Sequence, residues 1–161
     1  MITSSMITPV MEKILAHRGA VNSLLSFCGE LLAARGRKHD ASKFSNKELP
    51  LFEKITPLLA TMPYGSPEYT KLLDEMKPGL DEHYAKNDHH PEHFQRGIWG
   101  MDLFQILEML VDWQISAKQE IDFQKNAERF HIDPQLLAVL QNTARTLAKN
   151  EFWAAVQHHL A

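Results

Sequence analysis

The sequence has little cysteine, no long apolar run and no large excess of charge of either sign. Cys28 is the one cysteine among 161 residues, so no disulfide can form within the chain. No run approaches the roughly 18 apolar residues of a membrane span, and residues 1–10 lack an apolar stretch of signal-peptide length. A formal net charge of -3 provides no general attraction to nucleic acid. We therefore expect a cytoplasmic protein that binds neither membranes nor extended nucleic acid.

Strand-like alternation of apolar and polar residues is also missing. Apolar residues recur instead at the three-and-four spacing of one helix face, as do Ile14, Val21, Leu24, Cys28 and Leu31. Helix caps are expected at Ser66 and Asp133, and a capping box between Ser45 and Glu48. Together with proline–glycine stops, they predict helices over residues 14–35, 45–59, 66–78, 80–86, 102–122, 134–147 and 150–156. The sequence therefore predicts one all-α domain over residues 1–161, a bundle of six or seven helices with a short N-terminal tail at 1–8.

Histidine, in contrast, is abundant. The chain has nine histidines, and five of them fall between His39 and His93. Neutral imidazoles and ionised carboxylates bind first-row divalent metals. Candidate ligands occupy four separated positions: His17, the pair His39 and Asp40, the cluster His83, His89, His90 and His93, and finally Asp112. We predict that they form a centre for one or two ions of Mn, Fe, Co, Ni or Zn.

Each candidate ligand also has an ordinary structural interpretation. A lone histidine such as His17 on an apolar stripe is more often a core residue, and Asp40 could simply cap a helix. Asp112 lies in the most hydrophobic predicted helix, where an unpaired carboxylate would be costly. A bound cation would compensate it, although an arginine would serve too, the candidates being Arg18, Arg37 and Arg145.

Taken in chain order, these motifs resemble the HD superfamily of metal-dependent phosphohydrolases. The combination His-Asp-x-Ser-Lys-Phe, Asn-x-His-His-Pro-Glu-His and Glu-Met-Leu-x-Asp-Trp is similar to a small uncharacterised HD-like family often carried by phages. The resemblance implies that one ion is held by His17, His39, Asp40 and Asp112, and a second by His83 with His89, His90 or His93. It also implies hydrolysis of a phosphate ester, with a nucleotide as the favoured substrate, in the host cytoplasm if the protein is phage-encoded. The Gly-Tyr-Pro element of the cyclic-dinucleotide branch is absent, so that substrate class is not indicated.

Three further residues have expected roles around such a site. Lys43 and Arg18 would neutralise the part of the phosphate charge that the metal ions do not neutralise. Glu108 precedes Asp112 by one helical turn and would orient a ligand histidine, unless it is an ordinary surface residue. The expected partner is a small phosphate ester, and the sequence is also compatible with a homodimer.

Other functions are compatible with the same residues. Residues 89–93 contain the H-x-x-E-H signature of inverted zinc peptidases, but Pro91 between the two histidines disfavours the helix that this signature requires. Some HD proteins with two irons are oxygenases rather than hydrolases. A third alternative is a metal-stabilised interaction protein of phage origin without enzymatic activity.

Overall fold

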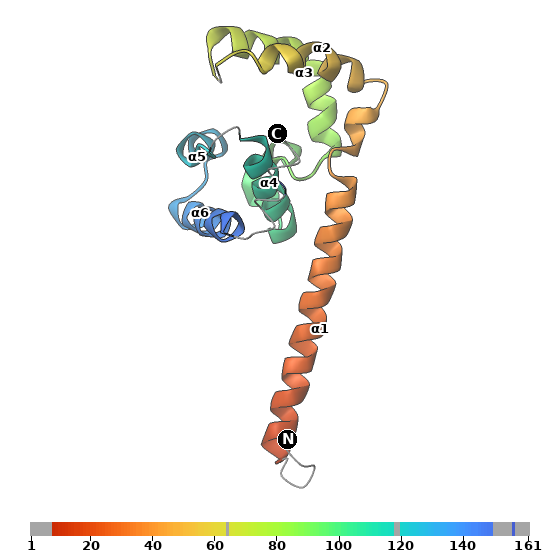
Figure 1. The fold of residues 1–161 in the computed structure, drawn as a ribbon, viewed down its shortest axis with the longest axis vertical. Coiled ribbons are helices and arrows are strands. Elements are labelled where there is room, and N and C mark those ends of the chain that lie inside the picture. The colour runs from red at the N-terminus through yellow and green to blue at the C-terminus, as the bar shows by residue number, and fades with distance from the viewer. Residues whose placement is uncertain (1–7, 64, 118–119, 150–155, 157–161) are drawn as a thin grey trace. The chain divides into compact units, whose positions relative to one another are not determined.

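The computed structural model describes residues 8–63, 65–117, 120–149 and 156, and these form helices without any strand (Figure 1). The described α-helices are α1 (Pro9–Lys38), α2 (Leu49–Leu59), α3 (Pro67–Lys86), α4 (Leu103–Ser116), α5 (Phe123–Phe130) and α6 (Pro134–Ala148). Three short 3-10 helices connect them: η2 (Ala41–Phe44), η3 (Pro91–His93) and η4 (Gly97–Gly100). The prediction of an all-α protein with six or seven helices is confirmed. Within this described part, every helix is too short or too polar to cross a lipid bilayer.

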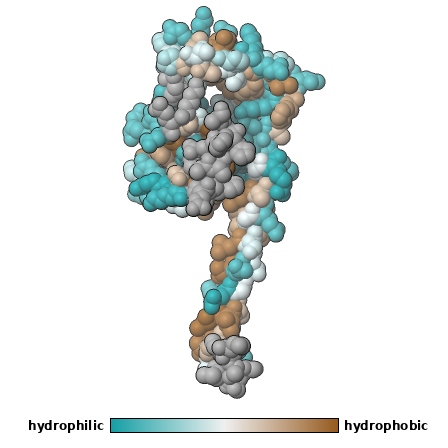
Figure 2. Space-filling view, viewed as in Figure 1, coloured by the Kyte–Doolittle hydropathy of each residue, from teal (hydrophilic) through white to brown (hydrophobic). Residues whose placement is uncertain are grey.

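The chain divides into two compact units, residues 1–38 and residues 39–161. Helix α1 makes up the described part of the first unit and has no buried residue. A single helix cannot bury its own apolar stripe, and Figure 2 shows brown, hydrophobic side chains along α1. The tail predicted at 1–8 falls almost entirely outside the described residues, and a single domain over the whole chain stays a prediction.

The main core of the second unit lies between α4, α5 and α6. Its buried side chains are Ile98, Met109, Leu110, Ala127, Ile132, Leu140 and Ala144. Asp133 caps α6 as expected, and Asp102, which was expected only at the start of its helix, caps α4; each accepts backbone N–H bonds. The prediction of one long helix over 102–122 is wrong: α4 ends at Ser116, and Asp122 caps the separate helix α5, where it accepts the Lys125 amide at 3.0 Å.

Helices α2 and α3 pack on each other, with Ile55 and Met76 almost completely buried. The predicted helix stop at Pro78 and Gly79 is wrong, because α3 continues through both residues to Lys86. Gly79 lies so close to α2 that an added Cβ atom would come within 2.6 Å of Leu51 Cδ1. An interior proline bends a helix, and Figure 1 shows that α3 changes direction along its length.

The start of α2 also differs from the prediction. The Ser45 hydroxyl does accept the Glu48 amide at 3.3 Å, but the helix begins only at Leu49. The Glu48 side chain, which a capping box would fold back onto the backbone, is instead completely buried. The helix predicted from Asn150 lies outside the described residues except at 156.

Candidate metal centre

The candidate site lies entirely within the second unit. His39 and Asp40 precede η2, His83 lies near the end of α3, His89 and His90 follow in the loop before η3, and Glu108 and Asp112 lie on α4. Asp40 has a left-handed backbone, with φ 55° and ψ 15°. Aspartate tolerates this conformation better than most residues. Residues other than glycine that adopt such an uncommon backbone conformation often occur at functional sites.

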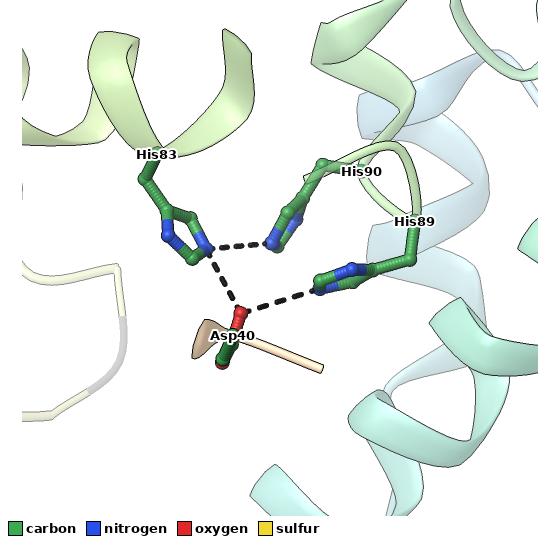
Figure 3. A group of neighbouring side chains, drawn as sticks. All are labelled: Asp40, His83, His89 and His90. Atoms are coloured by element: carbon green, nitrogen blue, oxygen red, sulfur yellow. Dashed lines mark hydrogen bonds and ion pairs between the residues drawn. The ribbon is translucent and has the colours of Figure 1, made fainter. Parts of the chain in front are cut away.

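Three imidazole rings converge on Asp40, as Figure 3 shows for His83, His89 and His90. Asp40 Oδ1 lies 3.2 Å from His83 Nε2 and 3.5 Å from His89 Nε2. His83 Nε2 in turn lies 3.0 Å from His90 Nε2. Asp40 Oδ1 and His89 Nε2 are both buried polar atoms with no hydrogen-bond partner in the described structure. Such atoms are costly, and a cation among them would satisfy them together.

The opposite edges of the rings contact two carboxylates. Glu108 Oε1 lies 2.9 Å from His39 Nδ1 and 3.3 Å from His89 Nδ1. Glu48 Oε2 lies 2.9 Å from His83 Nδ1. Histidines that bind metals usually donate the ring N–H remote from the ion to such a group. The contacts of Glu108 are those that its expected orienting role requires, and the role itself stays a prediction.

The second oxygen of Asp40 faces a different set of groups. Lys43 Nζ donates to Asp40 Oδ2, and His39 Nε2 lies 3.5 Å from the same oxygen. His39 Nε2 is also 3.6 Å from Asp112 Oδ1, so an imidazole lies beside Asp112. Asp40 therefore lies between the three histidines on one side and the His39–Asp112 pair on the other.

Burial and charge place most of these groups in the protonation state that metal ligands need. Burial lowers the pKa of His90 to about 3, and burial together with the charge of His39 lowers the pKa of His89. Burial acts to raise the pKa of Asp40, but its contacts with His83 and Lys43 outweigh this and hold the pKa well below its usual value. At neutral pH these side chains are thus two neutral imidazoles and a carboxylate.

His39 and Asp112 behave as a charged pair in the metal-free protein. Asp112 raises the pKa of His39 to about 9, with Glu108 and Asp40 adding to the effect and burial opposing it. Burial alone would raise the pKa of Asp112, yet the contact with His39 lowers it. His39 is therefore mostly protonated at neutral pH.

Some predicted site residues are not part of this group. His93 is exposed, and its Nδ1 donates to the Tyr84 carbonyl oxygen at 2.8 Å. His17 and Arg18 are exposed on α1, in the first unit, and their contribution to the site stays a prediction. Lys43 is adjacent to the site, as described above.

The peptidase signature does not form the required geometry. His89 lies in a loop and His93 at the end of η3, so they do not lie on successive turns of one α-helix. Glu92, which would be the general base, pairs with Arg129 at 2.8 Å. The residue that sequence reasoning missed is Glu48, whose Ser-x-x-Glu context is indistinguishable from an ordinary capping box.

Comparison with known proteins identifies a family but no activity. No curated protein and no solved structure matches the chain. The model of DUF5662, a family of unknown function, matches residues 6–146 and so includes every residue of the candidate metal centre. The chain therefore belongs to the DUF5662 family.

Proposed function

We propose that the protein is a metal-dependent phosphohydrolase of the HD type, which binds one or two divalent transition-metal ions and hydrolyses a phosphate ester such as a nucleotide. The observation that carries the proposal is the position of Asp40. One of its oxygens is buried without a hydrogen bond among histidine nitrogens, and the other contacts the Lys43 ammonium. A metal and a fixed positive charge would then lie on two sides of one carboxylate, which suits an anionic substrate.

The donor set decides which ions the site would prefer. Asp40, His83, His89 and His90 would hold the first ion. His39 Nε2 and Asp112 Oδ1, which lie 3.6 Å apart, offer ligands for a second ion. A set rich in imidazole favours Mn, Fe, Co, Ni or Zn over Mg.

The chemistry divides between the ion and the protein. A bound divalent ion supplies a water of lowered pKa and polarises the phosphoryl group. Glu108 and Glu48 hold the histidine rings, and Asp40 holds Lys43 near the site. Lys43 has a half-buried side chain that also lies 5.0 Å from the Phe52 ring centre, so its ammonium is positioned before substrate arrives. It would neutralise phosphate charge.

The test is a substrate screen on protein loaded with each of the five metals in turn. Nucleoside monophosphates, triphosphates and cyclic dinucleotides are incubated with it, and released phosphate, free nucleoside or, for the cyclic dinucleotides, the linear dinucleotide is measured. We expect turnover with at least one metal and its loss in Asp40→Asn, while Asp81→Asn, a change in an exposed ion pair with Lys77, retains it. Metal-loaded protein that hydrolyses none of these compounds would contradict the proposal.

The iron-loaded sample is assayed both with and without oxygen. Oxygen consumption with any of the same compounds, in the absence of hydrolysis, would indicate the di-iron oxygenase alternative instead. Protein that binds metal but does neither would favour a non-enzymatic interaction protein.

A further inference from the structure

We infer that Glu48 is a positioning residue that fixes the proton of His83 on Nδ1 and thereby makes its Nε2 available as a metal ligand. The inference rests on the metal centre of the proposed function. Glu48 is 0% exposed, and His83 and Asn87 beside it are 2% and 8% exposed. A carboxylate so far from water must be compensated by the groups around it.

The compensating groups form a small network on Glu48 Oε2. The Ser42 hydroxyl donates to this oxygen at 2.9 Å, and His83 Nδ1 lies at the same distance. Lys86 Nζ lies 4.0 Å from the other carboxylate oxygen. Three elements of the second unit, η2, α2 and α3, thus meet at one buried carboxylate.

The position of the proton follows from the neighbours of Nδ1. If Nδ1 carried only a lone pair, that lone pair would face a carboxylate oxygen at 2.9 Å, which is repulsive. The Asn87 amide also approaches Nδ1, at 3.1 Å, but its two hydrogens already have acceptors. One is donated to Ser42 Oγ and the other to the His83 carbonyl oxygen, each at 2.7 Å. With the proton on Nδ1, donated to Glu48 Oε2, each donor in this network has an acceptor.

This proton position determines what His83 presents to the centre. When the ring carries a single proton and that proton is on Nδ1, His83 has a bare Nε2 that faces His90 Nε2 and Asp40 Oδ1. With the proton on Nε2, His83 would instead donate to Asp40 and would not bind a metal. Glu48 therefore decides between a metal ligand and a hydrogen-bond donor.

The first test needs no metal. Nitrogen-15 chemical shifts of the imidazole rings in metal-free protein, at mildly alkaline pH, report which nitrogen of His83 carries the proton. We expect the Nδ1-protonated form in the unmodified protein. In Glu48→Gln we expect the Nε2-protonated form to become populated, because the amide no longer requires a donor from the ring. The Nε2-protonated form in the unmodified protein, or no change in the variant, would overturn the inference.

The second test is metal affinity, measured by competition with a coloured chelator. Glu48→Gln should bind metal roughly 10–100-fold more weakly, as is common when an outer carboxylate is lost. Glu82→Gln is the matched control, since Glu82 precedes His83 on α3 and pairs with Lys86 near the surface, and it should bind metal like the unmodified protein. Equal affinity in Glu48→Gln and unmodified protein would overturn the role of Glu48. If the unmodified protein binds no metal, the proposed function fails, while the chemical shifts still decide the position of the proton.

Discussion

Asp40 Oδ1 lies 3.2 Å from His83 Nε2, and neither the carboxylate oxygen nor the neighbouring His89 Nε2 has a hydrogen bond. An ion of Mn, Fe, Co, Ni or Zn should therefore stabilise the fold. At a free concentration roughly a hundredfold above Kd, binding adds about 3 kcal/mol to the free energy of unfolding. Thermal denaturation before and after removal of metal by a chelator measures this as a shift of several degrees in Tm. Identical melting curves, with no metal found by elemental analysis, would rule out the centre.

Asp40→Asn should reduce metal affinity by at least an order of magnitude and leave the helical content unchanged. Asparagine tolerates the left-handed backbone observed at this position, so the change removes charge without adding strain. Asp40→Ala removes the same ligand but must also adopt φ 55°, and should have the lower Tm of the two. Circular dichroism and metal titration of both variants separate the two effects. Retained metal affinity in Asp40→Asn would mean that the residue has only a backbone role.

Asp112→Asn distinguishes one metal ion from two. Asp112 faces His39 but is not among the four residues that gather around Asp40 Oδ1. If a second ion binds on the His39 side, the variant should bind one ion fewer per chain and keep the first with little change. Ser116→Ala is the control, because its hydroxyl donates to Asp112 Oδ1 at 3.2 Å without being a ligand. The same stoichiometry in variant and unmodified protein would leave Asp112 as a partner of His39 alone.

The two sides of Asp40 should respond differently to pH. His39 has a pKa of about 9 in the metal-free protein, so an ion that uses its Nε2 must displace a proton at neutral pH. The affinity for a metal ion bound through His39 should rise roughly tenfold per pH unit up to about pH 9 and then level off. His90, with a pKa of about 3, has no proton to release in this range, so affinity on its side should vary much less. Calorimetry in buffers of different ionisation enthalpy counts the released protons, and none released across pH 6–8 would exclude His39 as a ligand.

His90→Ala and His93→Ala form a matched pair on one short segment. His90 Nε2 lies 3.0 Å from His83 Nε2 within the cluster, whereas His93 is exposed and contacts the Tyr84 carbonyl. We expect the first change to lower metal affinity at least tenfold and the second to leave it within about twofold. Chelator competition measures both, and the opposite ranking would show that the ion binds elsewhere.

Local patterns determined much of the helical structure. Ser66 and Asp133 were expected to cap helices and do so, because a cap needs only a side-chain oxygen and backbone amides two or three residues away. The sequence likewise predicted that the site consists of histidines and carboxylates, since few other side chains bind transition metals. These features depend on neighbours along the chain or on composition.

Tertiary structure decided which candidates meet and what surrounds them. Local rules assigned Glu48 to a helix cap, yet packing of α2 against α3 places it on His83. His90 and His93 looked equivalent in the sequence, and a loop followed by η3 points only His90 at the cluster. The physical reason is the range of the interactions: helix periodicity and capping act within a few residues, whereas ligand contacts of about 3 Å depend on how distant segments pack.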